Sequence, residues 1–143
     1  MNVEAILRGK GSRVATVAPE ATIAEVVAAL QRERVGALVV SRDVGKVDGI
    51  ISERDIIHGL ARLGARLLEA KVGEHMTRLV FTCSPTDSVA ELMAQMTERR
   101  IRHIPVLRDG RLAGIISIGD VVKTRLDEME YETSSLRSFI VGG

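Results

Sequence analysis

Two stretches of the chain carry apolar side chains at the spacing of one helix face. In each stretch the apolar residues fall at positions i, i+3, i+4 and i+7, the pattern of a helix with one buried side. Each stretch opens with a hydroxyl residue three positions before a glutamate, Thr22 with Glu25 and Ser88 with Glu91, which predicts a capping box. We therefore predict two helices that begin at these residues. Their apolar positions are Ile23, Val26, Val27 and Leu30, and Val89, Leu92, Met93 and Met96.

The segments that contain these helices repeat one another. Residues 16–40 align with residues 82–106, and GIISERD at residues 49–55 returns as GIISIGD at residues 114–120. Within each copy, the apolar runs and turns predict the order strand, helix, strand, strand, helix. One copy alone buries too little apolar surface to be stable. We therefore predict an α/β (α+β) fold in which two β-α-β-β-α repeats pack about a pseudo-twofold axis.

The repeat divides the chain into a first domain at residues 1–66, a second domain at residues 67–127 and a C-terminal helical tail at residues 128–143. Apolar positions spaced alternately four and three residues apart lead into the tail, which is the 3.5-residue period of a helix seam. Such a seam packs either on its own module or on the same helix of a second chain, and we favour the second chain. The seam positions are Val122, Leu126, Met129, Thr133, Leu136 and Ile140.

Each GIIS strand is followed by a serine and an aspartate three residues apart, Ser52 with Asp55 and Ser117 with Asp120. One interpretation is a helix cap, in which the serine accepts from a backbone amide and the acidic residue stabilises the first turn. The other is a ligand site, because a helix N-terminus presents free amides to an anion and a carboxylate can accept two hydrogen bonds from a ribose diol. The two interpretations are compatible.

The composition bears on the class of ligand. Phe81, Tyr131 and Phe139 are the aromatic residues and the net charge is +1, so the chain has neither a base-stacking platform nor the excess of basic residues expected of a nucleic-acid-binding protein. No apolar run reaches the ~20 residues that a membrane helix needs. We predict a soluble, cytoplasmic protein that binds neither nucleic acid nor membrane, in which the single cysteine, Cys83, is a buried and unreactive thiol.

Catalytic and metal-binding patterns are missing from the sequence. Ser52 has no adjacent base, and the chain contains no GxSxG elbow and no P-loop. His58 and His75 stand apart from cysteines and from closely spaced carboxylates, so they do not form a metal set. We predict that the protein is not an enzyme and has no catalytic cofactor.

The doubled unit ending in GIISxxD resembles a pair of cystathionine β-synthase-type (CBS) domains. The resemblance extends from about Val3 to Lys123 and includes the MetThr of VGEHMT before the second repeat. It implies a regulatory module that binds adenosine-containing ligands such as AMP, ATP or NAD(H) in the cleft between the repeats, with the aspartate on the ribose hydroxyls. It also implies dimerisation into a flat disc.

The resemblance further implies that each pocket is shared, with its serine and aspartate from one repeat and its adenine-lining strand edges from the other. The first pocket would join Ser52, Arg54 and Asp55 with Thr77, Val80, Arg102, His103 and Ile104. The second would join Ser117 and Asp120 with Val14, Val35, Gly36, Ala37 and Leu38.

The two implied pockets differ in charge. Where the first has Arg102 and His103, the second has Gly36 and Ala37. An arginine binds phosphate through charge-assisted hydrogen bonds, which are stronger than neutral ones. The resemblance therefore predicts that the pocket of Asp55 is the one richer in phosphate-binding groups.

These expectations combine into one functional hypothesis. The chain is a sensor of adenine nucleotides or dinucleotides, works as a homodimer and acts on a separate, unknown effector protein. The rival hypothesis is a ligand-independent interaction or dimerisation adaptor, whose Ser-x-x-Asp elements are caps alone. An adenylate-handling enzyme is a third and weaker hypothesis, because no catalytic residues accompany the cleft. Detection of binding without turnover separates the three.

Overall fold

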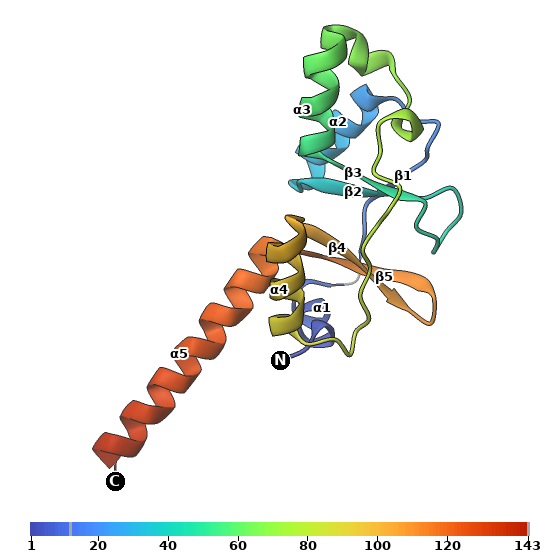
Figure 1. Ribbon diagram of the computed structural model, residues 1–143. Coiled ribbons are helices and arrows are strands. Elements are labelled where there is room, and N and C mark those ends of the chain that lie inside the picture. The colour runs from blue at the N-terminus through green and yellow to red at the C-terminus, as the bar shows by residue number, and fades with distance from the viewer. Residues whose placement is uncertain (12, 143) are drawn as a thin grey trace.

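The computed structural model describes residues 1–11 and 13–142, and its elements follow the predicted repeat. The first half lies above the second in Figure 1. Its helix α2 begins at the predicted capping box, since Thr22 and Glu25 make both reciprocal bonds. The elements of the first half are β1 (Thr16–Val17), α2 (Ile23–Glu33), β2 (Ala37–Val40), β3 (Gly49–Ser52) and α3 (Glu53–Leu63), followed by the short 3-10 helices η1 (Gly64–Glu69) and η2 (Val72–Glu74).

The second half repeats this order from its first helix onward, and helix α1 from the start of the chain packs on it. Ser88 accepts a hydrogen bond from the Glu91 amide at 3.0 Å and so caps the first turn of its helix, as predicted. The long final helix starts directly after Ser117, as α3 does after Ser52. The elements are α4 (Val89–Arg99), β4 (His103–Arg108), β5 (Arg111–Ser117) and α5 (Ile118–Gly142), with α1 (Val3–Lys10) at the start of the chain.

The two sheets differ by one strand. In the described residues β1, β2 and β3 form a three-stranded sheet, in which β1 is parallel and β3 antiparallel to β2, whereas β4 pairs antiparallel with β5 alone. The place of β1 is taken by a single bridge, in which the Cys83 amide donates to the Pro105 carbonyl at 3.0 Å and the Cys83 carbonyl accepts from Leu107 at 2.8 Å. Pro105 stands where the first half has Val39 and has no amide hydrogen to extend this ladder.

Helix α1 and the linker between the repeats, residues 64–78, each complete the core of a different half. In α1, Val3 is fully buried in the core of the second half, and its amide donates to Asp87 at 3.0 Å. In the linker, Val72 is fully buried in the core of the first half, and its amide donates to Ala21 at 2.8 Å. The two segments therefore play the same part, although one precedes both repeats and the other lies between them.

Strands β2 and β4 bury side chains on both faces, one toward the core of their own half and the other toward the neighbouring sheet. Leu38 of β2 points into the core of the first half and Ile104 of β4 into the core of the second. Successive side chains of a strand point to opposite faces. The neighbouring residues Ala37 and Val39 are therefore buried on the other face of β2, and Figure 1 shows the two sheets lying next to each other at the middle of the molecule.

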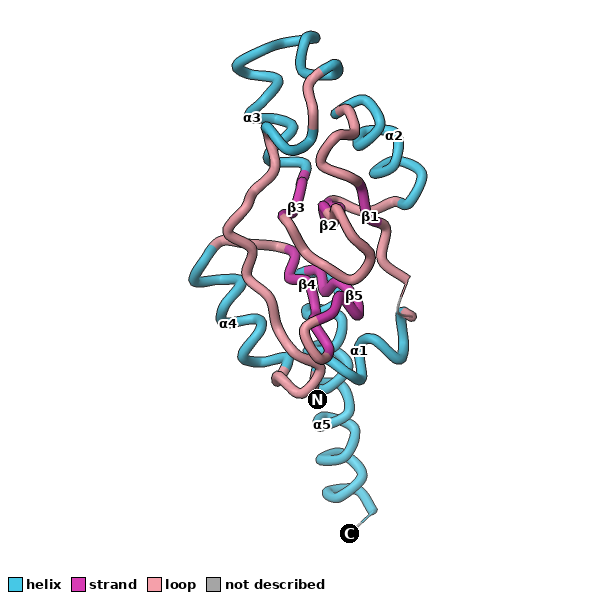
Figure 2. Tube along the Cα trace, turned by 90° about the vertical axis from the view of Figure 1, so that its right-hand side faces the viewer, coloured by secondary structure: helices cyan, strands magenta, loops and turns pink. Residues whose placement is uncertain are grey.

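Helix α5 leaves the body soon after it begins. Val121 is fully buried against the second half. The N-terminal amine pairs with Glu128 at 3.3 Å, and beyond that point every side chain from residue 129 to residue 140 is exposed. Figures 1 and 2 show the helix projecting from the body. The predicted C-terminal helix is thus confirmed, and it is continuous with the helix that starts at Ser117.

Candidate functional site

The first Ser-x-x-Asp element lies where β3 passes into α3. The Ser52 amide and hydroxyl both donate to Oδ2 of Asp55, at 2.8 and 3.0 Å. The hydroxyl of Thr77 donates to Oδ1 of the same carboxylate at 3.1 Å. Thr77 is held there by its backbone, which exchanges two hydrogen bonds with Ile50 of β3 at 2.8 and 3.0 Å. The structure thus brings a linker residue against the aspartate of the first half.

The second element, where β5 passes into α5, has a cation in the corresponding place. The Ser117 amide donates to Oδ2 of Asp120 at 2.9 Å, and the Asp120 amide donates to the Ser117 hydroxyl at 3.2 Å. Lys10, at the end of α1, pairs with Asp120 at 2.7 Å and also donates to the Ile115 carbonyl at 2.9 Å. Burial raises the pKa of Asp120, but the hydrogen bonds from Lys10 and Ser117 outweigh it and hold this pKa below its usual value. Asp120 is therefore ionised at neutral pH.

His103 lies between the two elements. In the sheet it is paired with Ser117. Its imidazole fills the space beside Gly36, where a Cβ would lie 3.2 Å from Cε1 of His103 and 3.3 Å from Oε1 of Glu53. Burial lowers the pKa of His103; of the nearby charges, Glu53 and Asp120 raise this pKa, and Lys10 and Arg102 lower it further. The result is a neutral imidazole at pH 7 between the starts of α3 and α5.

The remaining predicted residues fall into two groups. Leu38 and Ile104 are 1% exposed and belong to the two cores, so their side chains are turned away from the inter-sheet face and only their backbones could meet a ligand. The others, apart from Ala37, lie nearer the surface of the molecule. Arg54, Val35 and Arg102 are exposed, Val14, Gly36 and Val80 are half-buried, and Ala37 is buried on the inter-sheet face.

The backbone of Arg102 is joined to the start of the second element. The Ile118 amide, at the start of α5, donates to the Arg102 carbonyl at 2.8 Å, just as the Glu53 amide donates to Gly36 at 3.0 Å in the first half. Sequence reasoning had grouped Arg102 and His103 with Asp55. In the structure His103 is the strand partner of Ser117 and its imidazole also reaches Gly36 of the first half, while Lys10 is a basic group in contact with Asp120.

Lys10 is the residue that sequence reasoning missed. Lys10 belongs to α1, which precedes both repeats. A comparison of the two repeats therefore does not include it. The only sign in the sequence is a basic residue in the last turn of a short helix, where cations commonly complement the helix dipole. Its contact with Asp120 depends on how α1 packs against the second half, which no local pattern shows.

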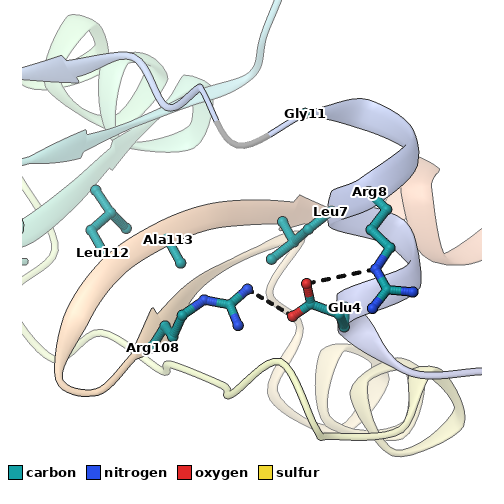
Figure 3. Close-up of a pocket in the computed structure, with 7 residues that line it drawn as sticks. All are labelled: Glu4, Leu7, Arg8, Gly11, Arg108, Leu112 and Ala113. Atoms are coloured by element: carbon teal, nitrogen blue, oxygen red, sulfur yellow. Dashed lines mark hydrogen bonds and ion pairs between the residues drawn. The ribbon is translucent and has the colours of Figure 1, made fainter.

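Among the described residues, two pockets lie away from the Ser-x-x-Asp elements. Figure 3 shows the larger, about 590 Å³, between α1 and the β4–β5 hairpin. Within it Glu4 pairs with Arg108 at 2.7 Å and with Arg8 at 3.9 Å, an arrangement that ties the helix to the hairpin. The smaller pocket, about 300 Å³, lies between the halves and is lined by residues that include Val14, a predicted site residue. Its other lining residues are Thr16, Ser41, Val44, Gly45, Arg111 and Leu112.

Two halves that share the order helix, strand, strand, helix, with an element of the same chemistry in each, define a tandem domain pair. The chain belongs to the CBS domain family: the family profile matches residues 11–62 and again residues 72–127. This confirms the resemblance drawn from GIISxxD. Members of this family that occur as pairs are regulatory modules. In the described residues no helix has both the length and the apolar character required to cross a membrane.

Relatives with known structures share the whole arrangement. The CBS-domain protein ATU1752 from Agrobacterium tumefaciens is 44% identical, with a TM-score of 0.85, over 87% of this chain and 99% of that one. The CBS domain pair of protein MJ0100, crystallised with 5′-methylthioadenosine and S-adenosyl-L-methionine, is 26% identical, with a TM-score of 0.79, over 90% of this chain and 98% of that one. Among curated proteins, the mitochondrial CBS domain-containing protein CBSX3 of Arabidopsis thaliana is 37% identical over 126 residues, which are 85% of this chain and 61% of the plant protein.

Proposed function

We propose that the protein is a regulatory sensor that binds an adenosine-containing ligand at its Ser-x-x-Asp elements and signals to a separate effector protein. The main observation is the doubled geometry: each aspartate lies at the start of a helix and is met by a residue from outside its own repeat, Thr77 for Asp55 and Lys10 for Asp120. A related domain pair was crystallised with two adenosine compounds, which supports this class of ligand. AMP, ATP and NAD(H) are the candidates to test first.

The two sites are unequal under this proposal. Lys10 contacts Asp120, the backbone of Arg102 joins the start of α5, and His103 lies between the two elements, so a phosphorylated ligand would favour Asp120 through Lys10. To admit the ribose, Lys10 would release Asp120 and bind the phosphate, which offers it a stronger charge-assisted partner. Its side chain is 34% exposed and has room to move. The first element offers the uncharged hydroxyl of Thr77 and suits the nucleoside part of a ligand.

Calorimetric titration of the full chain with AMP, ATP, NADH, S-adenosylmethionine and adenosine tests the proposal. At least one ligand should bind, raise the melting temperature by mass action and be recovered chemically unchanged. A flat response to all five would overturn the sensor function and favour the ligand-independent adaptor, because the capping bonds at both elements would then be the only role of the serines and aspartates.

The aspartate variants need a control, because Asp55→Ala and Asp120→Ala also remove a helix cap. Thr22→Ala provides it, since Thr22 caps α2 with a full capping box and is remote from both elements along the chain. Loss of such a cap costs about 1 kcal/mol. All three variants should lose stability, but only the aspartate variants should lose ligand affinity.

We also propose that the protein is a homodimer. Val27 of α2 corresponds to Met93 of α4, and Ile57 of α3 corresponds to Val122 of α5; all four side chains are apolar and exposed. A second copy would cover these matching positions. Light scattering over a range of concentrations tests this, and a monomer at every concentration would contradict it. The cytoplasmic location expected from the sequence stays a prediction.

A further inference from the structure

The outer part of α5 lacks the packing that stabilises most helices. Residues 129–140 are all exposed, and Figures 1 and 2 show this stretch extending away from the body. An isolated helix of about 12–15 residues is marginal in water, because tertiary packing of an apolar face supplies most helix stability. A partner for this part of α5 is therefore expected.

The seam residues supply such an apolar face. Five of the six are exposed hydrophobic residues, from 45% for Val122 to 75% for Ile140, and Thr133 is the polar one near the middle. In a heptad written abcdefg, Leu126, Thr133 and Ile140 take position a. Val122, Met129 and Leu136 take position d.

The residues flanking the seam carry charges that select the partner. Arg125 and Glu132 occupy g positions on one side, and Glu130 and Arg137 occupy e positions on the other. In a parallel, in-register pair, each g residue faces the e residue five positions later on the other helix. Arg125 would then meet Glu130 of a second copy, and Glu132 would meet Arg137. Both contacts join opposite charges, and each occurs twice.

An antiparallel pair of the same two helices brings like charges together. With the seams fully overlapped, residues at e meet e and residues at g meet g. Glu130 would then face Glu130 of the other copy, Glu132 would face Glu132, and Lys123 would face Arg137. The charge pattern therefore opposes the antiparallel arrangement and matches the parallel one.

We propose that α5 pairs with α5 of a second copy as a parallel, in-register, two-stranded coiled coil. The proposal rests on the homodimer proposed above and adds its direction. Because α5 begins in the second half, a parallel pair brings the two second halves side by side, and each half then lies on the same side of the dimer as its counterpart. A head-to-tail dimer, with first half against second half, would separate the two helices and is not compatible with this coil.

Crosslinking of Thr133→Cys tests the direction. Position 133 faces its own counterpart in a parallel in-register coil, whereas it faces position 129 in the fully overlapped antiparallel one. Mild oxidation should convert most of this variant into a disulfide-linked dimer. Ser138→Cys, at an outward-facing f position, is the matched control and should crosslink far less. Cys83 is buried and its pKa is raised to about 12, so the native thiol adds little background. Equal crosslinking at both positions, or none at 133, would overturn the proposal.

Charge exchange gives a second test that forms no covalent bond. Arg137→Glu and Glu132→Arg should each raise the dimer dissociation constant roughly 5- to 10-fold, because two attractive contacts become repulsive. The double variant, in which the charges are exchanged, should have the dissociation constant of the unchanged protein. In the antiparallel arrangement Arg137→Glu would instead tighten the dimer through Lys123. Sedimentation equilibrium distinguishes these results, and tightening by Arg137→Glu or no rescue in the double variant would overturn the proposal. Ligand titration of the same variants reports on the sensor function independently.

Discussion

The first and second halves have the same fold but are completed differently. Asp55 receives a hydroxyl from Thr77, while Asp120 receives an ammonium from Lys10. Helix α3 ends at Gly64, whose φ of 59° lies in the region that favours glycine, whereas the corresponding residue of α5 is Met129 and the helix continues to Gly142. The comparison shows how a duplicated scaffold becomes asymmetric: the repeated residues keep the fold, and residues outside the repeat differentiate the two sites.

The largest expected difference between the halves concerns two corresponding glycines. A Cβ on Gly49 would lie 2.8 Å from the backbone carbonyl of Thr77, while a Cβ on Gly114 would meet the flexible end of Leu7. Gly49→Ala should therefore lower the free energy of unfolding by about 2–3 kcal/mol, the usual range for overpacking a fixed backbone. Gly114→Ala should cost about 1 kcal/mol because Leu7 can turn aside. Urea unfolding measures both, and equal costs would contradict the asymmetry.

The next effect concerns Lys10 and sharpens the comparison of the two sites. Lys10→Met should weaken AMP or ATP binding at the second site roughly 10- to 100-fold, the effect of one hydrogen bond to a charged group, and leave adenosine binding undiminished. Thr77→Val is the matched variant at the first site. It should affect AMP and adenosine equally, because Thr77 contacts the carboxylate of Asp55 that we propose binds the ribose. Calorimetric titration with both ligands is the measurement. If Lys10→Met lost the same affinity for AMP as for adenosine, Lys10 would not be a phosphate-binding residue.

A smaller difference should appear with pH. The folded pKa of His103 lies below the ordinary value of about 6.5 because of burial, so the unfolded chain binds a proton first as the pH falls. Stability should decrease as the pH is lowered below about 6.5. The corresponding residue of the first half is Ala37, which does not titrate. His103→Gln should flatten this part of a thermal unfolding profile, and an unchanged slope would show that another group is responsible.

The smallest expected difference lies in the caps of the two equivalent helices. Thr22 and Glu25 exchange both bonds of the capping box, and Ser88 receives one from the Glu91 amide. Thr22→Ala should cost about 1 kcal/mol, and Ser88→Ala a few tenths less. Chemical denaturation resolves the difference. A larger cost for Ser88→Ala would mean that the second helix depends more on its cap than these bonds indicate.

The spacing of apolar and polar residues along the chain predicted most of the fold and part of the candidate site. The stripe beginning at Ile23 and the duplicated GIIS predicted helices and strands that the structure contains, because burial has the same period as the backbone geometry. The predicted burial was wrong at Val27 and Met93, which are exposed and lie outside the two cores. Pro105 has no amide hydrogen for a further ladder bond, and the absence of a third strand from the second sheet, in the part of the chain that the structure describes, follows from it. Cys83 is buried, as expected.

The rest depended on contacts between distant parts of the chain. Lys10 reaches Asp120 only because α1 packs on the second half, where Val3, Ile6 and Leu7 are buried in its core. The position of His103 beside Ser117, with its imidazole reaching Gly36, follows from the register of β4 with β5 and the approach of the two sheets. A single sequence shows which residues are apolar or charged but not which distant segments meet.

The location of α1 has a consequence for the order of biosynthesis. The first half can close as soon as the linker has left the ribosome, since Leu67 and Val72 follow its strands directly. The second half needs Val3, Ile6 and Leu7, which are translated before both repeats but find their core only when residues 83–121 have emerged. During that interval the apolar face of the nascent N-terminal helix stays unburied. Chaperones that hold nascent chains would therefore be expected to engage α1 until residues 83–121 have emerged.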